Sequence, residues 1–388
     1  MAGVYPMRAI RFKSPPDALA SFLCPPYDSI TAGEASRLRK NPLNAVHLEL
    51  PEGESAKPYE AAARTWRRWR KKGVLEAEDG EGFYVLEENF FHGGRRLRRL
   101  GLLAALGIAG RDARALLPHE RTIEAPVLHR LRLLEAARAN TSPIFSICPD
   151  PGGRILKLLK EISAESAPVV KSHAEEEAEF KLWRVPESPV AARLRRLLAR
   201  QKAFIADGHH RLEAARRYHA EVRTAASRAV LAGIYPGSQK SLVVLAAHRV
   251  VGRALQGRAR GLARLVEMPS MRALLSRLRA EKNPYAFGLW DQGFHLGIPR
   301  DASGCRTRLS VEWVGRRLLR GMPPSAIRYL HDPAAAAAMA GAAGGAAVFV
   351  KPPTLRGLFR AARGGLLPQK STYFTPKIPT GILFREIR

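Results

Sequence analysis

The stretch KAFIADGHHRLEAARRYHA, residues 202–220, carries the clearest structural signal in the chain. It begins with an apolar run, residues 203–206, that is typical of a buried strand. Leu212, Ala215 and Tyr218 then recur at helical spacing, which predicts a helix over residues 209–223. A group of polar residues therefore falls in the strand-to-helix turn and in the first helical turn.

The polar residues of this turn predict an anion site, because backbone N–H groups and the helix dipole attract anions to a helix N-terminus. Gly208 lets the backbone approach a ligand closely, and Arg211 can hold a phosphate through two hydrogen bonds. His209 and His210 can donate to phosphate oxygens or shuttle a proton, and Asp207 can hold a metal ion or orient a histidine. The alternative is that Asp207 only caps the helix and His210 is a core histidine. Four polar functional groups in five residues exceed what capping needs, so we favour the anion site.

The composition is that of an ordinary globular protein. A chain of 388 residues can form two or three domains, and its hydrophobic content of 46% and charged content of 26% are ordinary. Its apolar runs fall short of the roughly 20 residues of a membrane helix, and we see no secretory signal pattern. Three widely spaced cysteines argue against a disulfide framework and against a multi-cysteine zinc site. We therefore expect a protein of the reducing cytoplasm with no membrane partner.

The net charge of +29 allows two interpretations. One is an acidic partner such as nucleic acid, because Lys and Arg neutralise phosphates and release counterions. The other is a solvated surface, since much of the excess lies in residues 63–73, 93–101 and 190–202, where arginines alternate with apolar residues. The excess is spread along the chain, and no helix-turn-helix pair with a basic recognition helix stands out. We favour the solvated surface and keep nucleic acid as the weaker alternative.

Helices and strands mix along the chain without regular alternation, which predicts an α+β (mixed α/β) fold instead of a doubly wound sheet. Thr31 and Glu34 have the spacing of a capping box at a helix start. Apolar spacing predicts a helix over residues 57–72, and we expect residues 44–51 to be extended. Two apolar runs around residues 92–94 predict a β-hairpin.

Six blocks of the sequence resemble one known family. They are CPPYDSI (24–30), LPHERT (117–122), ANTSPIF (139–145), ADGHHR (206–211), AAHRVV (246–251) and LPQKSTYFTPKIPTG (367–381). In this order they resemble a conserved bacterial and archaeal family known as domain of unknown function 1015, over essentially the whole chain. The ADGHHR block by itself resembles the ParB/sulfiredoxin-like superfamily, particularly the free serine kinases, in which this motif lies at the nucleotide phosphates.

The resemblance implies a ParB/sulfiredoxin-like core with additional α/β elements. Residues 1–252 would form a catalytic, nucleotide-binding core, and residues 253–388 a C-terminal α/β region that packs back on it. The implied activity is Mg²⁺-dependent phosphoryl transfer between ATP or ADP and a small hydroxylated metabolite, with L-serine or O-phosphoserine as the best candidates. The direction stays open. The alternatives are a ParB-like nucleic-acid-binding protein and a nucleotide-binding regulatory protein without turnover, and a homodimer is also left open.

Carried over residue by residue, the resemblance assigns the turn to the nucleotide phosphates. Asp207, Gly208, His209 and Arg211 would bind phosphate, with Asp207 also a Mg²⁺ ligand, and His210 would be catalytic. No phosphate loop, kinase glycine-rich loop or dinucleotide fingerprint is present in the sequence, so nucleotide use would depend on this turn.

The free serine kinases also use a glutamate to deprotonate the serine hydroxyl, and no motif in this chain matches it. From residue types, Glu120 is the first candidate for this catalytic base, because His119, Glu120 and Arg121 crowd an acid/base pair and a phosphate-binding side chain into one loop. Glu34 is the second candidate. The alternative for the loop is a salt bridge between Glu120 and Arg121.

Three further loops offer candidate ligand-binding groups. Pro25 and Pro26 form a rigid step before Tyr27 and Asp28, which we expect to bind substrate, against simple turn formation as the alternative. Two further groups of residues complete the set: Thr141 and Ser142 for substrate, and Lys370 for phosphate. The alternative for the loop around Lys370 is a polar turn that packs its aromatic residues onto the core.

Overall fold

The computed structural model describes residues 3–13, 18–52, 56–173, 178–199, 201–364, 367 and 370–387. These residues divide into two compact units. The larger unit comprises Met1–Pro118, Thr122–Leu242 and Pro376–Arg388, and the smaller comprises His119–Arg121 and Val243–Thr375. Pro368 and Gln369, in the last of the six sequence blocks, lie outside the described residues. The predicted functional boundary after residue 252 stays a prediction.

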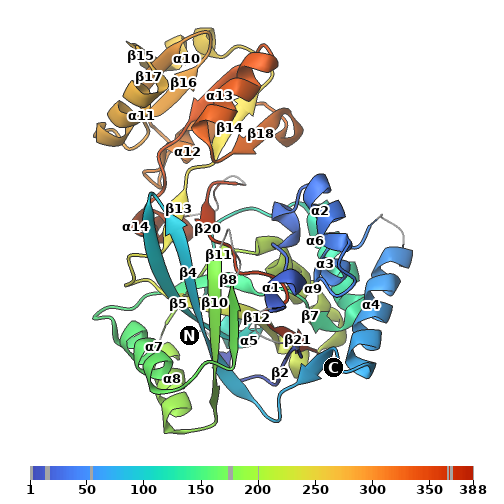
Figure 1. Cartoon of the computed structure of the whole chain (residues 1–388). Helices are drawn as coiled ribbons and strands as arrows, with labels where there is room; N and C mark the ends of the chain where they lie inside the picture. The colour runs from blue at the N-terminus through green and yellow to red at the C-terminus, as the bar shows by residue number, and fades with distance from the viewer. Residues whose placement is uncertain are drawn as a thin grey trace. The chain divides into compact units, whose positions relative to one another are not determined.

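The larger unit is built on a nine-stranded mixed sheet with the order β6-β11-β8-β12-β5-β4-β10-β9, and β1 pairs with β5 (Figure 1). Its strands are β1 (Val4–Tyr5), β4 (Gly82–His92), β5 (Arg95–Gly107), β6 (Leu116–Pro118), β8 (Ile144–Cys148), β9 (Val170–His173), β10 (Ala178–Pro186), β11 (Ala203–Asp207) and β12 (Ala229–Pro236). β11 runs parallel to β6, and β12 runs parallel to β8. The predicted hairpin is confirmed: β4 pairs with β5 across Gly93 and Gly94, whose φ values of 58° and 74° suit a tight hairpin turn.

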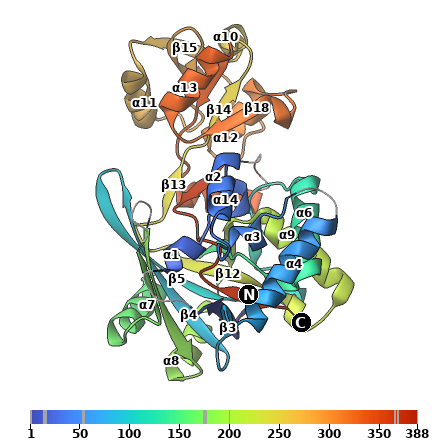
Figure 2. The same ribbon diagram turned by 45° about the vertical axis from the view of Figure 1, so that its right-hand side comes forward.

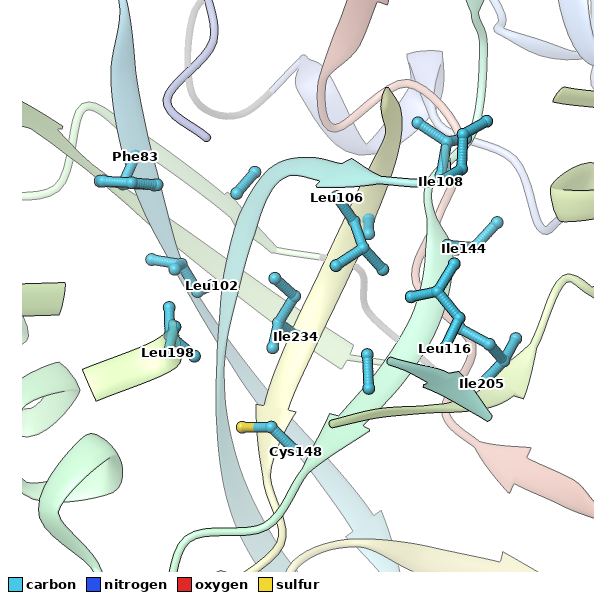
Figure 3. Packing of buried hydrophobic residues seen from close by; sticks show 14 of the residues in the cluster. Phe83, Leu102, Leu106, Ile108, Leu116, Ile144, Cys148, Leu198, Ile205 and Ile234 are labelled. Atoms are coloured by element: carbon cyan, nitrogen blue, oxygen red, sulfur yellow. The ribbon is translucent and has the colours of Figure 1, made fainter. Parts of the chain in front are cut away.

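Helices cover one face of this sheet. The helices of the unit are α1 (Leu19–Phe22), α2 (Ala32–Arg39), α3 (Val46–Glu49), α4 (Ala56–Lys71), α5 (Gly110–Ala113), α6 (Glu124–Ala137), α7 (Arg154–Glu165), α8 (Pro189–Leu198) and α9 (His209–Val222). α7 and α8 lie against β4, β5 and β10, whereas α9 lies against β8 and β12 and packs on α6 (Figure 2). Apolar side chains of the sheet and of α6 to α9 form one continuous core, part of which Figure 3 shows.

Local sequence patterns explain most of these helix positions. The Thr31 side chain accepts the N–H of Glu34 at 3.3 Å at the start of α2, which confirms the predicted helix start. The helices predicted over residues 57–72 and 209–223 are α4 and α9. The extended conformation predicted for residues 44–51 is wrong, because Val46–Glu49 forms the short helix α3.

A second sheet ties the C-terminal segment into the larger unit. Its order is β3-β2-β21-β7, with β2 (Ala9–Phe12), β3 (Leu75–Ala77), β7 (Ala139–Asn140) and β21 (Phe384–Glu386). Every pair in it is antiparallel. Because β21 pairs with strands from the first half of the chain, the residues after Pro376 belong to the larger unit.

The smaller unit contains a six-stranded antiparallel sheet with the order β15-β17-β16-β19-β14-β18. Its strands are β14 (His248–Val251), β15 (Ala263–Met268), β16 (Phe287–Trp290), β17 (Phe294–Pro299), β18 (Ile327–Leu330) and β19 (Ala346–Phe349). A separate pair joins β13 (Val243–Leu245) to β20 (Tyr373–Thr375). The helices are α10 (Gln256–Leu262), α11 (Met271–Ala280), α12 (Ser310–Trp313), α13 (Pro333–Ala342) and α14 (Leu355–Gly364).

Both faces of the six-stranded sheet are covered by helices. α11 and α13 pack on one face, and α10 and α12 pack on the other, so alternate residues of each central strand enter different apolar clusters. Several sheets combined with many helices confirm the mixed α+β fold class. None of the helices in the described residues combines the length and the apolar character that a membrane span requires.

Candidate functional site

The candidate site lies in the larger unit, where β11 ends and α9 begins. Asp207 is the last residue of β11, and Gly208 precedes α9 with φ 86°. A Cβ atom at position 208 would lie 3.0 Å from Ile144 Cγ2 and 3.1 Å from Arg211 Nε. The left-handed backbone and the close packing both require glycine here. The turn therefore brings an aspartate and the N-terminus of a 14-residue helix together.

An ion cluster surrounds the Asp207 carboxylate, and we call Asp28, Asp207, Arg211 and Lys377 the Asp207 cluster. Lys377 Nζ lies 2.8 Å from Asp28 Oδ2 and 3.1 Å from Asp207 Oδ1. Arg211 Nη2 donates to Asp207 Oδ2 at 2.7 Å. Burial alone would lower the pKa of Lys377, but the Asp207 and Asp28 carboxylates raise it above its usual value. One ammonium group, from a side chain that is 8% exposed, thus joins two carboxylates that are far apart in the sequence.

His210 is oriented by two hydrogen bonds. Its Nε2 accepts the N–H of Ile123 at 3.1 Å, and its Nδ1 lies 3.4 Å from the Tyr27 hydroxyl oxygen. Because a backbone N–H can only donate, Nε2 carries no proton in this arrangement and Nδ1 carries the proton of the neutral ring. His210 therefore links the loop that contains Tyr27 and Asp28 to the start of α9. Burial raises the pKa of Tyr27 to about 12, so its hydroxyl stays protonated at neutral pH.

Glu49 forms a second buried cluster beside Tyr27. Its carboxylate accepts the hydroxyl protons of Thr141 at 2.8 Å and of Ser142 at 2.9 Å. It also accepts the N–H of Tyr27 at 3.3 Å, and Arg130 Nη1 lies 3.3 Å from its Oε1. The Arg130 guanidinium carbon lies 4.0 Å from the centroid of the Tyr27 ring. The structure therefore brings the candidate substrate residues Tyr27, Thr141 and Ser142 together around one common partner, Glu49, which was not among the predicted residues.

A buried ion pair between Arg99 and Glu88 holds the C-terminal segment. Arg99 Nη2 donates to the carbonyl oxygen of Pro376 at 2.6 Å, directly before Lys377. Arg99 also forms two 2.7 Å hydrogen bonds to Glu88, and both side chains are 0% exposed. The Tyr235 hydroxyl donates to Glu88 at 2.7 Å. The interpretation of residues 93–101 as solvated surface is thus wrong for Arg99, which fixes the backbone that carries Lys377.

Glu120 and its neighbours lie in the smaller unit, with Lys370. The Glu120 carboxylate accepts the backbone N–H groups of Lys370 at 3.2 Å, Ser371 at 2.9 Å and Thr372 at 3.1 Å. It also accepts the Thr372 hydroxyl at 3.2 Å. This carboxylate therefore holds residues 370–372 in one conformation. Arg121 is exposed.

The two remaining predicted residues, Glu34 and His209, lie in the first turns of helices. Glu34, the second candidate for the base, lies half-buried in the first turn of α2. His209 is buried at the start of α9.

Sequence patterns missed the partners of the predicted residues. Glu49 and Arg130 each lie within an apolar stretch of the sequence. A charged residue in such a stretch is the signal that could have indicated a buried polar site. Lys377 belongs to the last of the six blocks, but nothing local connects it to Asp207. Only the fold brings these three side chains to the predicted residues.

The Mg²⁺ ion that the resemblance implies does not fit the Asp207 carboxylate. One Asp207 oxygen accepts from Arg211 and the other contacts Lys377. A divalent ion there would lie beside two buried positive charges, which repel it. Within the ranges that the structure describes, no group of three or more His, Cys, Asp or Glu residues could hold a metal. Asp207 is therefore better suited to orient cationic side chains than to bind a metal.

A comparison with solved structures finds matches that share little sequence with this chain. A free serine kinase in complex with AMP is 12% identical, with a TM-score of 0.39, and the match covers 71% of this chain and 87% of the kinase. A conserved hypothetical protein from Pyrococcus furiosus is 14% identical, with a TM-score of 0.39 over 72% of this chain and 93% of that chain. SbnI with a C-terminal truncation, from Staphylococcus aureus, is 7% identical, with a TM-score of 0.38 over 72% and 85%.

Sequence comparison gives a firmer result. No curated protein matches the sequence. The model of the family described as "Protein of unknown function (DUF1015)" matches residues 4–310. This match covers most of the 388 residues and includes the ADGHHR turn. The chain therefore belongs to the DUF1015 family.

Proposed function

We propose that the protein is a phosphotransferase that moves a phosphoryl group between an adenine nucleotide, ATP or ADP, and a small hydroxylated metabolite. L-Serine and O-phosphoserine are the first candidates for the metabolite. One observation carries the proposal: Lys377 joins Asp28 to Asp207 directly beside Arg211 and the N-terminus of α9. Phosphoryl transfer needs positive charge around the phosphate oxygens and a carboxylate for the hydroxyl proton. The Asp207 cluster contains both.

The proposal includes a ParB/sulfiredoxin-like architecture for the nucleotide-binding core, residues 1–252, with residues 253–388 as an additional α/β region. The terminal phosphate would bind at the N-terminus of α9, where Gly208 lets the backbone come close. Arg211 and Lys377 would offset the charge on the phosphoryl oxygens. Asp207 would hold these two cations in position.

Asp28 is the carboxylate best suited to act as the base. Its side chain is 24% exposed, and its Oδ2 accepts a hydrogen bond at 2.8 Å from the Lys377 ammonium, which can turn toward a phosphate. Asp28 would accept the hydroxyl proton while the substrate oxygen attacks the terminal phosphorus and the bond from that phosphorus to the nucleotide oxygen breaks. In the reverse direction Asp28 would return the proton. Glu120 is less suited, because three backbone N–H groups and a hydroxyl occupy its carboxylate.

A phosphoryl-exchange assay tests the proposal. Pure protein is incubated with Mg²⁺, ATP or ADP, and a panel of hydroxy-amino acids and their phosphates, and products are followed by phosphorus NMR. We expect exchange in the wild type and none in Asp207→Ala or His210→Ala. Glu60→Ala is the matched control, because it removes an exposed ion pair with Arg64 and should retain full activity. Absence of both exchange and calorimetric nucleotide binding in the wild type would end the proposal.

A DNA titration at several salt concentrations tests the weaker alternative, nucleic-acid binding, which the net charge of +29 suggests. Binding through phosphates loses affinity steeply as salt increases. We expect weak binding that Asp207→Ala does not change. Tight DNA binding without phosphoryl exchange would favour the nucleic-acid function instead.

A further inference from the structure

We infer that a small cavity between α6 and α9 binds the carboxylate group of an amino-acid substrate. The cavity has a volume of about 30 Å³ and lies within the larger unit. Arg130, Asn140, Thr141, Ser142 and Arg211 contribute to its polar wall, and apolar residues complete the lining. The identity of the ligand as a substrate rests on the proposed function, whereas the carboxylate site itself does not.

Arg211 supplies the first observation. Its residue is 8% exposed, so the guanidinium is shielded from bulk water. Nη1 donates to the Pro143 carbonyl oxygen at 2.6 Å and Nη2 donates to Asp207 at 2.7 Å. Nε is buried and has no hydrogen-bond partner in the part of the chain that the structure describes. A buried cationic N–H without an acceptor is costly, so this atom calls for an anion or a water molecule beside it.

Arg130 supplies the second observation, from a different helix. It is 5% exposed, and its Nη2 donates to the Glu49 carbonyl oxygen at 2.8 Å. Nη1 lies 3.3 Å from a Glu49 carboxylate oxygen as an ion pair, yet among the described residues it too is buried without a hydrogen-bond partner. Arg130 of α6 and Arg211 of α9 therefore line the same cavity, and each has a buried guanidinium N–H group without a hydrogen-bond partner among the described residues.

The small volume of the cavity limits which chemical groups can enter it. A volume of about 30 Å³ holds one or two water-sized groups, which suits the two oxygens of a carboxylate and is too small for a phosphate or a nucleobase. Ala214 and Val230 form apolar parts of the wall and give a larger group no polar partner.

The charge of the surroundings favours an amino acid over a simple anion. Three cations, Lys377, Arg211 and Arg130, face three carboxylates, Asp28, Asp207 and Glu49. A simple anion would leave one uncompensated negative charge in this partly buried cluster. An amino acid brings its own ammonium group and keeps the charge balanced, so its total cost of desolvation is lower.

Calorimetry on the full chain tests this inference with matched ligands. L-Serine and O-phospho-L-serine are compared with ethanolamine and O-phosphoethanolamine, which differ by lacking the carboxylate. We expect each carboxylate-free ligand to bind about 30-fold more weakly, the order of one charge-assisted hydrogen bond. Val230→Ile adds one methylene group to the cavity wall and should weaken L-serine binding about 10-fold while leaving ethanolamine binding unchanged.

Val85→Ile is the matched control, because Val85 is buried in the same core but does not line the cavity. Equal affinity for L-serine and ethanolamine, or wild-type L-serine affinity in folded Val230→Ile, would overturn the inference and leave the cavity to water. If phosphoryl exchange is absent but the affinity difference persists, the proposed function fails and the carboxylate site stands. If none of the four ligands binds, formate and formamide decide the question: thermal stabilisation by formate alone, lost in Val230→Ile, supports the site, and no such stabilisation overturns it.

Discussion

Asp207 and Glu120 each carry a carboxylate with several donors, but the donors differ in kind. Asp207 is held by the side-chain cations of Arg211 and Lys377, whereas Glu120 is held by backbone N–H groups and the hydroxyl of Thr372. A side-chain cation can be shared between its carboxylate and a ligand phosphate, but a backbone N–H cannot leave its acceptor without unfolding its loop. Under the proposed function, Asp207 would serve the chemistry, whereas Glu120 would hold the conformation of residues 370–372.

The largest expected effect is that of Asp207→Asn. The substitution keeps the shape of the side chain but removes the charge that positions Arg211 and Lys377. We expect phosphoryl exchange to fall by about 10³-fold or more, because electrostatic stabilisation by preorganised groups is commonly the largest catalytic contribution. Initial rates measure the effect, and a thermal melt checks that the variant is folded. An active Asp207→Asn protein would remove Asp207 from the site.

The next largest effect separates the two carboxylates as candidate bases. We expect Asp28→Asn to lower kcat by about 10²-fold to 10³-fold, the typical contribution of a general base. Glu120→Gln should change kcat by less than about 3-fold but lower the melting temperature, because its amide nitrogen cannot accept the N–H bonds of residues 370–372. Steady-state kinetics on both variants decide between them. The reverse pattern, a large loss in kcat for Glu120→Gln alone, would identify Glu120 as the base.

Two lysines extend the comparison to phosphate binding. The Lys377 ammonium contacts Asp28 and Asp207, whereas Lys370 contacts Glu120 through its backbone N–H. We expect Lys377→Met to raise the KM for the nucleotide by about 10-fold to 100-fold, because a charge-assisted hydrogen bond to phosphate is lost. Lys370→Met should leave it within about 2-fold, since a backbone bond survives the substitution. Equal KM increases in both variants would contradict this expectation and would identify Lys370 as a phosphate ligand.

Sequence patterns predicted the local parts of the site and missed the long-range ones. The turn around Gly208 follows from an apolar run, a glycine and helical spacing, all within 20 residues. Lys377 lies 349 residues from Asp28, and only the complete larger unit brings them together. Glu49, which accepts hydrogen bonds from Tyr27, Thr141 and Ser142, lies 92 residues from Thr141 in the sequence, so no local pattern connects them.

Arg99 shows the same limit for charge patterns. It lies among exposed arginines in residues 93–101 and shares their spacing, yet it is fully buried against Glu88. Whether an arginine faces water or a buried carboxylate depends on what packs against that strand face. A strand pattern alone carries no such information.

The smallest expected effect concerns pH and compares the two units through one histidine in each. Burial, and then the charge of Arg130, lowers the pKa of His129 in the larger unit to about 4. The unfolded chain binds a proton at this histidine near pH 6.5, whereas the folded chain does not until about pH 4, so acid favours unfolding between these values. We expect the melting temperature to fall as pH decreases through this window, and to fall less in His129→Asn. Burial likewise lowers the pKa of His248 in the smaller unit to about 4, so His248→Asn should blunt the acid response of that unit instead. Melts from pH 7 to pH 4 with a probe in each unit test this assignment, and an unchanged pH profile in both variants would contradict it.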